Sequence, residues 1–214
     1  MPDINKSVNL TNSKLKSIID SKKREVAYNH NSWSDKELEC VRSEIRNFYR
    51  KEQNFKCSYC KREVSYVSAS NAQVEHIVPK SLHLNFMFEE KNLCVICADC
   101  NEIKRKQETF SELPDTIVNV HLKRYPRASN SFKIIHPHFD IYDEHILITP
   151  EGYYVDKDSK KGRFTIDACR LNRKLNKKFG LCDCLTTNPN KIININKIYN
   201  KSRFIISDLL QLFK

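Results

Sequence analysis

The middle of the chain reads Cys57-Ser-Tyr-Cys60, then Val74-Glu75-His76-Ile77-Val78-Pro79, and finally Cys97-Ala-Asp-Cys100. Each Cys-x-x-Cys pair offers two thiolates on a tight turn, and four thiolates suit a tetrahedral structural zinc ion. The 36 residues between the pairs exceed the spacer of a simple zinc ribbon, so the intervening segment must be a structural insert. We therefore predict a zinc site at four cysteines: Cys57, Cys60, Cys97 and Cys100.

A carboxylate and an imidazole, Glu75 and His76, lie between the two cysteine pairs. A neutral imidazole is a suitable base for taking a proton from water, and a carboxylate is a suitable ligand for Mg²⁺. Adjacent side chains on a regular strand point to opposite faces, so both groups reach one site only where the strand ends. The alternative is a Glu-His pair without a chemical role, and the two asparagines that follow, Asn92 and Asn101, disfavour it.

A third cysteine, Cys94, precedes the second pair and makes the run Cys94-x-x-Cys97-x-x-Cys100. Such a run also occurs in iron–sulfur proteins, but no Cys-Pro follows it here, and the first cysteine pair completes a four-ligand set more naturally. We expect Cys94 to be a small core residue.

Four further cysteines lie far from this set. Cys40 and Cys169 fall on the apolar faces of predicted helices, so we expect both in the core. Cys182 and Cys184 form a Cys-x-Cys pair, which is weak evidence for a metal site.

Composition limits the class of protein. The chain has 214 residues, 40% of them hydrophobic, which is ordinary for a globular protein with a real core. It contains no run of eighteen apolar residues and begins without the apolar segment of a secretory signal, so we expect neither a membrane span nor export. Nine cysteines without such a signal favour a cytoplasmic location, where paired cysteines bind metal more often than they form disulfides.

The formal net charge of +11 favours a polyanionic partner such as nucleic acid. A basic balance that only improves solubility is the alternative, and charge alone does not separate the two. The basic and partly aromatic stretch His121, Lys123, Arg124, Tyr125 and Arg127 is likewise consistent with a phosphate backbone contact or with solvated surface.

Residues 1–54 are predicted to form an N-terminal helical region. Apolar spacing indicates a helix over 13–27 and a second helix that ends near residue 53. Ser34 and Glu37 have the spacing of a capping box at the start of that second helix, whose arginines, Arg42, Arg46 and Arg50, are expected on a solvated face.

Residues 55–110 are predicted to form the metal-binding module. Short strands are expected at 64–66 and 73–78, with a Ser-Ala-Ser-Asn connection between them, and a helix is expected over 98–107. The module is therefore expected to be a hairpin followed by a helix.

Residues 111–214 are predicted to form a C-terminal α+β region. A strand over 145–149, a turn and a return strand over 153–155 precede an expected helix over 165–179, which ends at Gly180. Apolar residues at helical spacing over 192–213 indicate either a surface that docks a partner or the closing helix of the core. The cluster His136, His138, Asp140 and His145 is interpreted as a turn rather than a second metal or phosphate site.

Cys-x-x-Cys, Glu-His-Ile-x-Pro, Asn-Leu and Cys-x-x-Cys-Asn-x-x-Lys, in this order, resemble the HNH branch of the His-Me finger (ββα-metal) endonucleases. The resemblance implies an α+β fold, with a zinc-stapled ββα-metal (HNH) module embedded in a mostly helical single chain. It implies His76 as general base and Asn92 as the residue that braces its loop. It implies Glu75 and Asn101 as ligands of one catalytic Mg²⁺ or Mn²⁺ ion, although Asp and His are more usual at these two positions.

A narrower resemblance extends beyond the module. Val74 to Ser81, followed by His136-Pro-His-Phe-Asp140 and His145-Ile146, is similar to the PtuB-like HNH effectors of Septu and retron-associated antiphage systems. This resemblance implies a defence role beside an ABC/SMC-type ATPase (PtuA-like) partner, and association with a retron RNA and reverse transcriptase complex.

These features together favour a metal-dependent endonuclease that hydrolyses phosphodiester bonds in nucleic acid, with DNA favoured and RNA left open. Lys104 lies one helical turn after Asn101 and, with Arg105, is predicted to contact nucleic acid near the scissile phosphate. Two alternatives remain: a zinc-stapled module that binds nucleic acid without cutting it, and an adaptor subunit with a decayed site.

Overall fold

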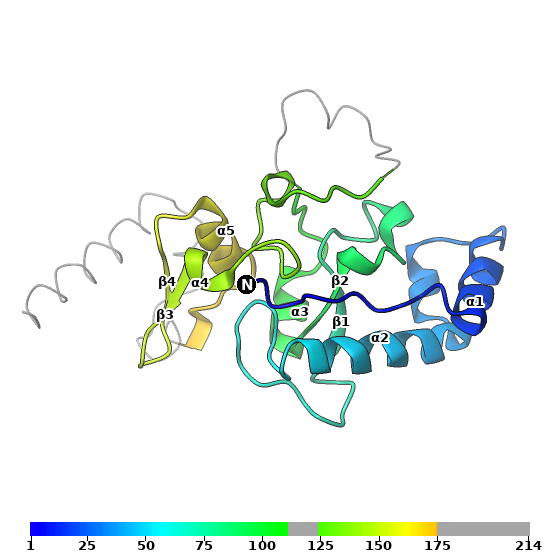
Figure 1. Ribbon diagram of the computed structural model, residues 1–214, viewed down its shortest axis with the longest axis horizontal. Helices are drawn as coiled ribbons and strands as arrows, with labels where there is room; N and C mark the ends of the chain where they lie inside the picture. Colours follow the sequence, from blue (N-terminus) through cyan, green and yellow to red (C-terminus); the bar gives the residue numbers. More distant parts are fainter. Residues whose placement is uncertain (111–123, 175–214) are drawn as a thin grey trace, which may run out of the picture. The chain divides into compact units, whose positions relative to one another are not determined.

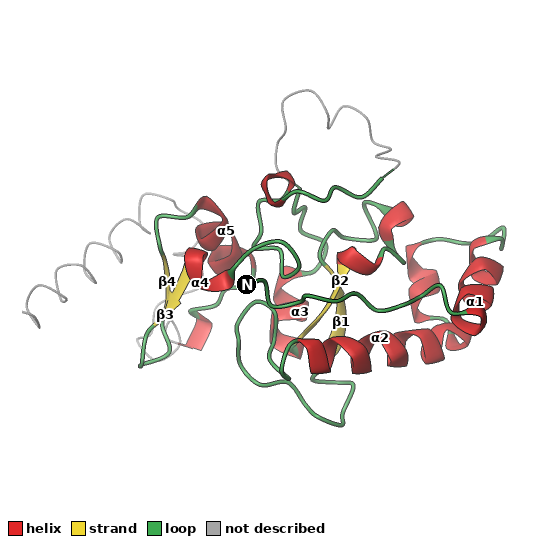
Figure 2. Ribbon diagram, viewed as in Figure 1, coloured by secondary structure: helices red, strands yellow, loops and turns green. Residues whose placement is uncertain are grey.

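The computed structural model describes residues 1–110 and 124–174. Met1–Leu171 form one compact unit and Asn172–Lys214 form a second, of which only residues 172–174 are described. The described residues of the first unit form helices and two separate two-stranded antiparallel sheets (Figures 1 and 2). This mixture is consistent with the predicted α+β class.

The hairpin that carries Glu75 and His76 is made of β1 (Gln73–His76) and β2 (Leu93–Ile96), with His76 opposite Leu93. The helix α3 (Ala98–Lys104) follows β2 directly and contacts β1 (Figure 1). α3 ends earlier than the expected residue 107 because Arg105 has a φ of 48°, a left-handed conformation that a helix cannot continue.

The prediction of a strand over 64–66 as the partner of β1 was wrong. In that region Glu63 makes only an isolated bridge with Lys56, and the chain continues as a loop to β1. The true partner is β2, whose four residues are all buried. A short, continuously apolar stretch such as Leu-Cys-Val-Ile is typical of a strand covered on both faces, and here it joins the Asn92 motif to the second cysteine pair.

The second of the two N-terminal helices packs against this hairpin. α1 (Ser13–Lys23) is capped by the Asn12 side chain and ends earlier than expected, while α2 (Glu39–Glu52) contacts both strands. The buried side chains of α2 are Val41, Ile45, Tyr49 and Arg50.

Three expectations for this region were wrong. The capping box lies at Asn29 and Ser32, which close a 3₁₀ turn, because Ser34 is itself the last residue of that turn. Cys40 is exposed near the start of α2 rather than in the core. Arg50 is buried rather than solvated, and its guanidinium donates to the carbonyls of the loop that precedes β1.

The C-terminal part of the first unit contains α4 (Tyr142–His145), β3 (Ile146–Ile148), β4 (Tyr154–Asp156) and α5 (Lys160–Ala168). The predicted hairpin is confirmed as β3 paired with β4, and Gly152 in its turn has a φ of 85°. The predicted helix over 165–179 is found only in part, and residues 175–179 lie outside the described residues. α5 begins earlier, where the Ser159 hydroxyl caps it, and it stops before Arg170, whose φ is 43°.

Several predictions fall outside the described residues. These are the contacts of His121 and Lys123, the helix end at Gly180, the Cys182–Cys184 pair and the apolar stripe over 192–213.

Two tyrosines connect the C-terminal elements to the first cysteine pair. The Tyr142 hydroxyl donates to the carbonyl of Tyr59 at 2.7 Å, and the Tyr154 hydroxyl donates to the carbonyl of Cys60 at 2.5 Å. Cys169 is buried, as expected. α4 and β4 therefore support the turn that presents two of the thiols.

Candidate zinc centre and active site

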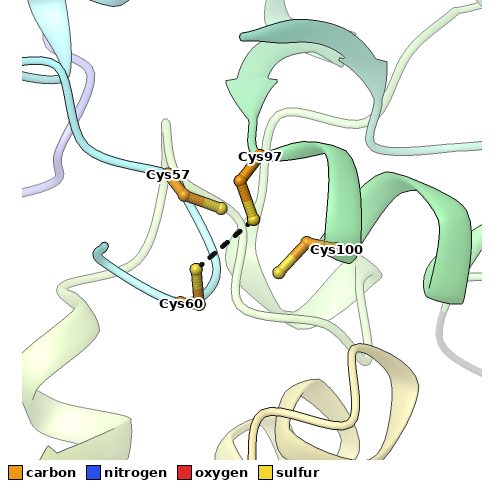
Figure 3. A group of neighbouring side chains, drawn as sticks. All are labelled: Cys57, Cys60, Cys97 and Cys100. Carbon is orange, nitrogen blue, oxygen red and sulfur yellow. Dashed lines mark hydrogen bonds between the residues drawn. The ribbon is translucent and has the colours of Figure 1, made fainter. Parts of the chain in front are cut away.

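The four predicted zinc ligands lie together. The sulfur atoms of Cys57, Cys60, Cys97 and Cys100 are all within 4.8 Å of one another and all four residues are buried (Figure 3). The Cys60 and Cys97 sulfurs are 3.6 Å apart. Zinc–sulfur bonds of about 2.3 Å in a tetrahedron place neighbouring sulfurs roughly 3.8 Å apart. The geometry and donor type of this cluster therefore fit a zinc ion.

Local backbone structure brings the two pairs together. In the first pair, the Cys57 N–H donates to the Arg62 carbonyl at 2.9 Å, and Lys61 adopts a φ of 55°, so the chain turns back sharply. In the second pair, Cys97 is the N-cap of α3 and Cys100 lies in its first turn. One pair thus lies on a turn and the other at a helix start, and both face the same point.

The thiols perturb one another. Hydrogen bonding from Cys100 helps to lower the pKa of Cys97 to about 7, whereas burial raises the pKa of Cys57. Zinc binds thiolates and releases the protons of the thiols, so a bound ion would keep all four cysteines deprotonated despite these opposed pKa shifts. Cys94 is buried outside the cluster, and burial raises its pKa, as expected for a core thiol.

His76 lies at the end of β1 with 6% of its surface exposed. Its Nε2 is 3.1 Å from the Met87 carbonyl oxygen, and the Trp33 ring meets the imidazole edge to face at 4.5 Å between centroids. Because a carbonyl only accepts, this contact assigns the proton of the neutral ring to Nε2 and the lone pair to Nδ1. Burial lowers the pKa of His76 to about 3, so the ring is neutral at physiological pH.

Glu75 is also buried, and it forms an ion pair with Lys104. The Lys104 Nζ is 2.5 Å from Glu75 Oε1 and 3.4 Å from the His76 carbonyl. Burial raises the pKa of Glu75, although the charges of Lys104 and Lys80 oppose that shift. Lys104 therefore neutralises a carboxylate that the fold has withdrawn from water.

These contacts bear on the predicted nucleic-acid contacts. Lys104 is only 2% exposed and is committed to Glu75, which differs from the surface position expected for a phosphate contact. Arg105 is exposed and pairs with Glu102 of the same helix. Contact of either residue with nucleic acid stays a prediction.

Asn92 uses its whole hydrogen-bonding capacity in the loop after β1. Its Oδ1 accepts from the Val78 N–H at 2.7 Å and from the Tyr125 hydroxyl at 3.1 Å. Its Nδ2 donates to the carbonyls of Val78 and Phe86, each at 3.0 Å. An amide side chain has two donors and two acceptor sites, so this buried residue is fully satisfied. It ties the segment after His76 to the segment before β2.

Asn101 lies on α3, and its Nδ2 donates to Oε1 of Gln73 at the start of β1. The helix places Asn101 one turn from Lys104, which contacts Glu75. Carboxylate and amide oxygens are the hard donors that Mg²⁺ and Mn²⁺ prefer, and a buried carboxylate is a favourable site for a cation. The donor types of Glu75 and Asn101 therefore fit the predicted divalent ion, which would have to replace the Lys104 ammonium now paired with Glu75.

Several residues that surround His76 had no role predicted from the sequence. Trp33 and the Met87 carbonyl contact the imidazole, and Lys80 contributes positive charge near Glu75. Trp33 and Met87 lie outside every motif, and Lys80 lies within the Val74 to Ser81 stretch without a role predicted for it. The contact between Tyr125 and Asn92 is also new, although Tyr125 belongs to a stretch that its aromatic and basic composition had already singled out.

Comparison with known proteins identifies this region. Residues 57–107, about a quarter of the chain, match the family model described as HNH endonuclease. Searches of the curated proteins and of the solved structures found no match. In the part of the chain that the structure describes, no helix has both the length and the apolar character needed to cross a membrane. The HNH domain supports nuclease activity, for which nucleic acid is the substrate.

Proposed function

We propose that this protein is a metal-dependent endonuclease that hydrolyses phosphodiester bonds in nucleic acid, with DNA as the favoured substrate and RNA as the second. The observation that carries the proposal is the state of His76. Its imidazole is neutral, its Nε2 is held by the Met87 carbonyl, and Nδ1 keeps the lone pair that a general base requires. This arrangement lies within the HNH match.

The residues of the chain divide the chemistry between them. When bound, a Mg²⁺ or Mn²⁺ ion held by Glu75 and Asn101 would supply positive charge at the phosphate. His76 Nδ1 takes a proton from a water molecule, and the water oxygen attacks phosphorus. The bond from phosphorus to the 3′ oxygen breaks, that oxygen takes a proton from solvent, and the products are a 5′ phosphate and a 3′ hydroxyl.

The low pKa of His76 is compatible with this role. Burial is its principal cause, and the charges of Lys80 and Lys104 add to it. An anionic phosphate beside the ring favours the imidazolium form and opposes these effects. The base therefore gains strength when substrate is in place.

We also propose a biological setting for this activity. The stretch Val74 to Ser81 and the motif over residues 136–146 that follows it resemble PtuB-like effectors. On that basis the protein is a cytoplasmic antiphage nuclease that works with an ABC/SMC-type ATPase, and a retron RNA and reverse transcriptase complex is a further candidate partner.

A cleavage assay tests the nuclease. The assay incubates three proteins with plasmid DNA and with total RNA: wild type, His76→Ala and the control His30→Ala. The control alters an exposed histidine that is distant from His76 in the sequence. Each reaction contains Mg²⁺, Mn²⁺ or chelator. We expect metal-dependent cutting by wild type and His30→Ala, and a loss of about 10²-fold or more for His76→Ala.

The alternatives make a different prediction. A zinc-stapled binding module or adaptor would bind nucleic acid or its partner equally well with and without the His76 side chain. Neither wild type nor His76→Ala would then cleave nucleic acid. Zinc content and circular dichroism of each variant show whether a loss of cutting reflects the missing imidazole or a lost fold. Repeating the assay with the ATPase present separates a silent effector from a protein without catalysis.

A further inference from the structure

A buried chain of hydrogen bonds leads away from Asn92 into the C-terminal half of the first unit. The Tyr125 hydroxyl donates to Asn92 Oδ1 and lies 2.9 Å from Nε2 of His136. The backbone N–H of His138 donates to Nδ1 of the His136 ring at 3.3 Å. Asn92, His136 and Tyr125 are each between 0% and 5% exposed, so water cannot replace these partners.

The donors and acceptors of this chain can be arranged in one way. A hydroxyl has a single hydrogen, and the hydrogen of Tyr125 goes to Asn92, because the second amide oxygen site would otherwise be empty. His136 must then donate from Nε2 to the Tyr125 oxygen, which leaves Nδ1 as the acceptor for the His138 N–H. The side chains of Asn92, Tyr125 and His136 are then all satisfied with His136 neutral, and burial keeps His136 neutral by lowering its pKa well below the usual value.

The far end of the chain is anchored by charge. Asp140 Oδ2 accepts from the backbone N–H of His136 at 2.6 Å and from the Lys161 ammonium of α5 at 2.5 Å. The Ser129 hydroxyl donates to the other oxygen of Asp140. Aromatic packing holds the imidazole as well, since the rings of His136 and Phe139 stack at 4.2 Å between centroids.

A second histidine contacts the strand opposite His76. His138 Nε2 is 2.8 Å from the carbonyl oxygen of Leu93, which is the residue paired with His76 in the hairpin. The turn that contains both histidines therefore supports the loop after His76 through Asn92 and supports the neighbouring strand directly.

We propose that Tyr125 and His136 are positioning residues for the active site: they hold Asn92 in the orientation that fixes the backbone of Val78 and, through it, the loop that begins at His76. The turn over 136–140 is thus part of the active-site framework and not only a way to reverse the chain. This proposal rests on the proposed nuclease function for its catalytic consequence.

The test uses two variants that remove the hydrogen bonds and keep an aromatic ring at each position. Tyr125→Phe deletes the hydroxyl, and His136→Phe keeps an aromatic ring beside Phe139. Amide hydrogen exchange and cleavage kinetics are measured on the full-length protein. We expect exchange at the Val78 N–H to rise roughly tenfold or more while amides of α2 stay protected. We expect kcat to fall roughly 10- to 100-fold with little change in KM.

Tyr142→Phe is the matched control. It removes another buried tyrosine hydroxyl, which donates to the Tyr59 carbonyl and has no bond to Asn92. We expect its melting temperature to fall by an amount similar to that of Tyr125→Phe, with exchange at Val78 unchanged.

Two results would overturn the proposal. Wild-type exchange at Val78 in both phenylalanine variants would show that Asn92 does not depend on this chain. A rise in exchange spread evenly over all amides would show a purely structural role. If wild type cuts no substrate, the nuclease proposal fails, and the exchange at Val78 still decides whether the two residues position the loop.

Discussion

The charged and titratable side chains of the candidate active site are buried, and the Glu75–Lys104 ion pair is the clearest example. Both residues are buried, and the ammonium contacts the carboxylate at 2.5 Å. We expect Lys104→Met to leave an unpaired buried carboxylate and to lower the free energy of unfolding by about 3–5 kcal/mol. Urea denaturation measures this change. The double variant with Glu75→Gln is expected to regain most of the loss, and equal instability of the two variants would contradict the pairing.

A second effect at this scale depends on pH. Burial lowers the pKa of His138 to about 4, whereas an unfolded histidine titrates near 6.5. Between these values the unfolded chain binds more protons, so stability that is fully present above about pH 6.5 declines as the pH falls toward 4. The loss at this residue is at most about 3 kcal/mol.

Thiolate protonation also destabilises a zinc protein in acid, so a control is needed for His138. His138→Gln lacks the titrating ring. We expect the difference in unfolding free energy between wild type and this variant to shrink as the pH falls from 6.5 to 4. A difference that does not vary with pH would assign the acid sensitivity to groups other than His138, such as the zinc thiolates or the buried His76 and His136.

At the scale of elements, a close approach fixes how α5 packs. A Cβ added to Gly162 would lie 2.2 Å from the carbonyl oxygen of His145, at the end of α4. Alanine is normally the better helix former, so in an open helix Gly162→Ala would stabilise. Here we expect overpacking to dominate and to cost about 1–3 kcal/mol, as measured by thermal unfolding. A stabilised variant would mean that α5 is not seated against α4.

The elements also show which structural features the sequence pattern predicted and which it did not. Cysteine spacing identified the four clustered thiols, because Cys-x-x-Cys turns have few geometries. β2 was missed because its apolar run is short and lies between two motifs. The bond from Tyr125 to Asn92 joins residues 33 positions apart, and no local periodicity reports such a contact. The loop before β1 was misassigned because its ordering comes from the distant Arg50.

At the scale of the whole molecule, zinc is expected to stabilise more than its own turn. Tyr142 and Tyr154 donate to carbonyls of the first cysteine pair, so α4 and β4 depend on that turn. We expect about one zinc ion per chain, as one four-thiolate site requires. We expect chelation or Cys97→Ser to unfold the β3–β4 hairpin together with the β1–β2 hairpin. Metal analysis and amide exchange measure both.

Independent unfolding of the two hairpins would contradict this expectation. Cys40→Ser is the control, because Cys40 is exposed and lies outside the thiol cluster, and it should leave zinc content and stability unchanged.

The hydrogen-bond chain from Asn92 to His136 has a consequence for synthesis. A ribosome makes every residue of the HNH match, 57–107, before it reaches Tyr125 and His136. A nascent or prematurely terminated chain that ends before residue 125 would contain the proposed catalytic side chains without the contacts that hold their loop. If the proposed nuclease cuts the DNA of its own cell, incomplete translation products would be less active than the finished chain, and full activity would arise once Tyr125 and His136 make their contacts.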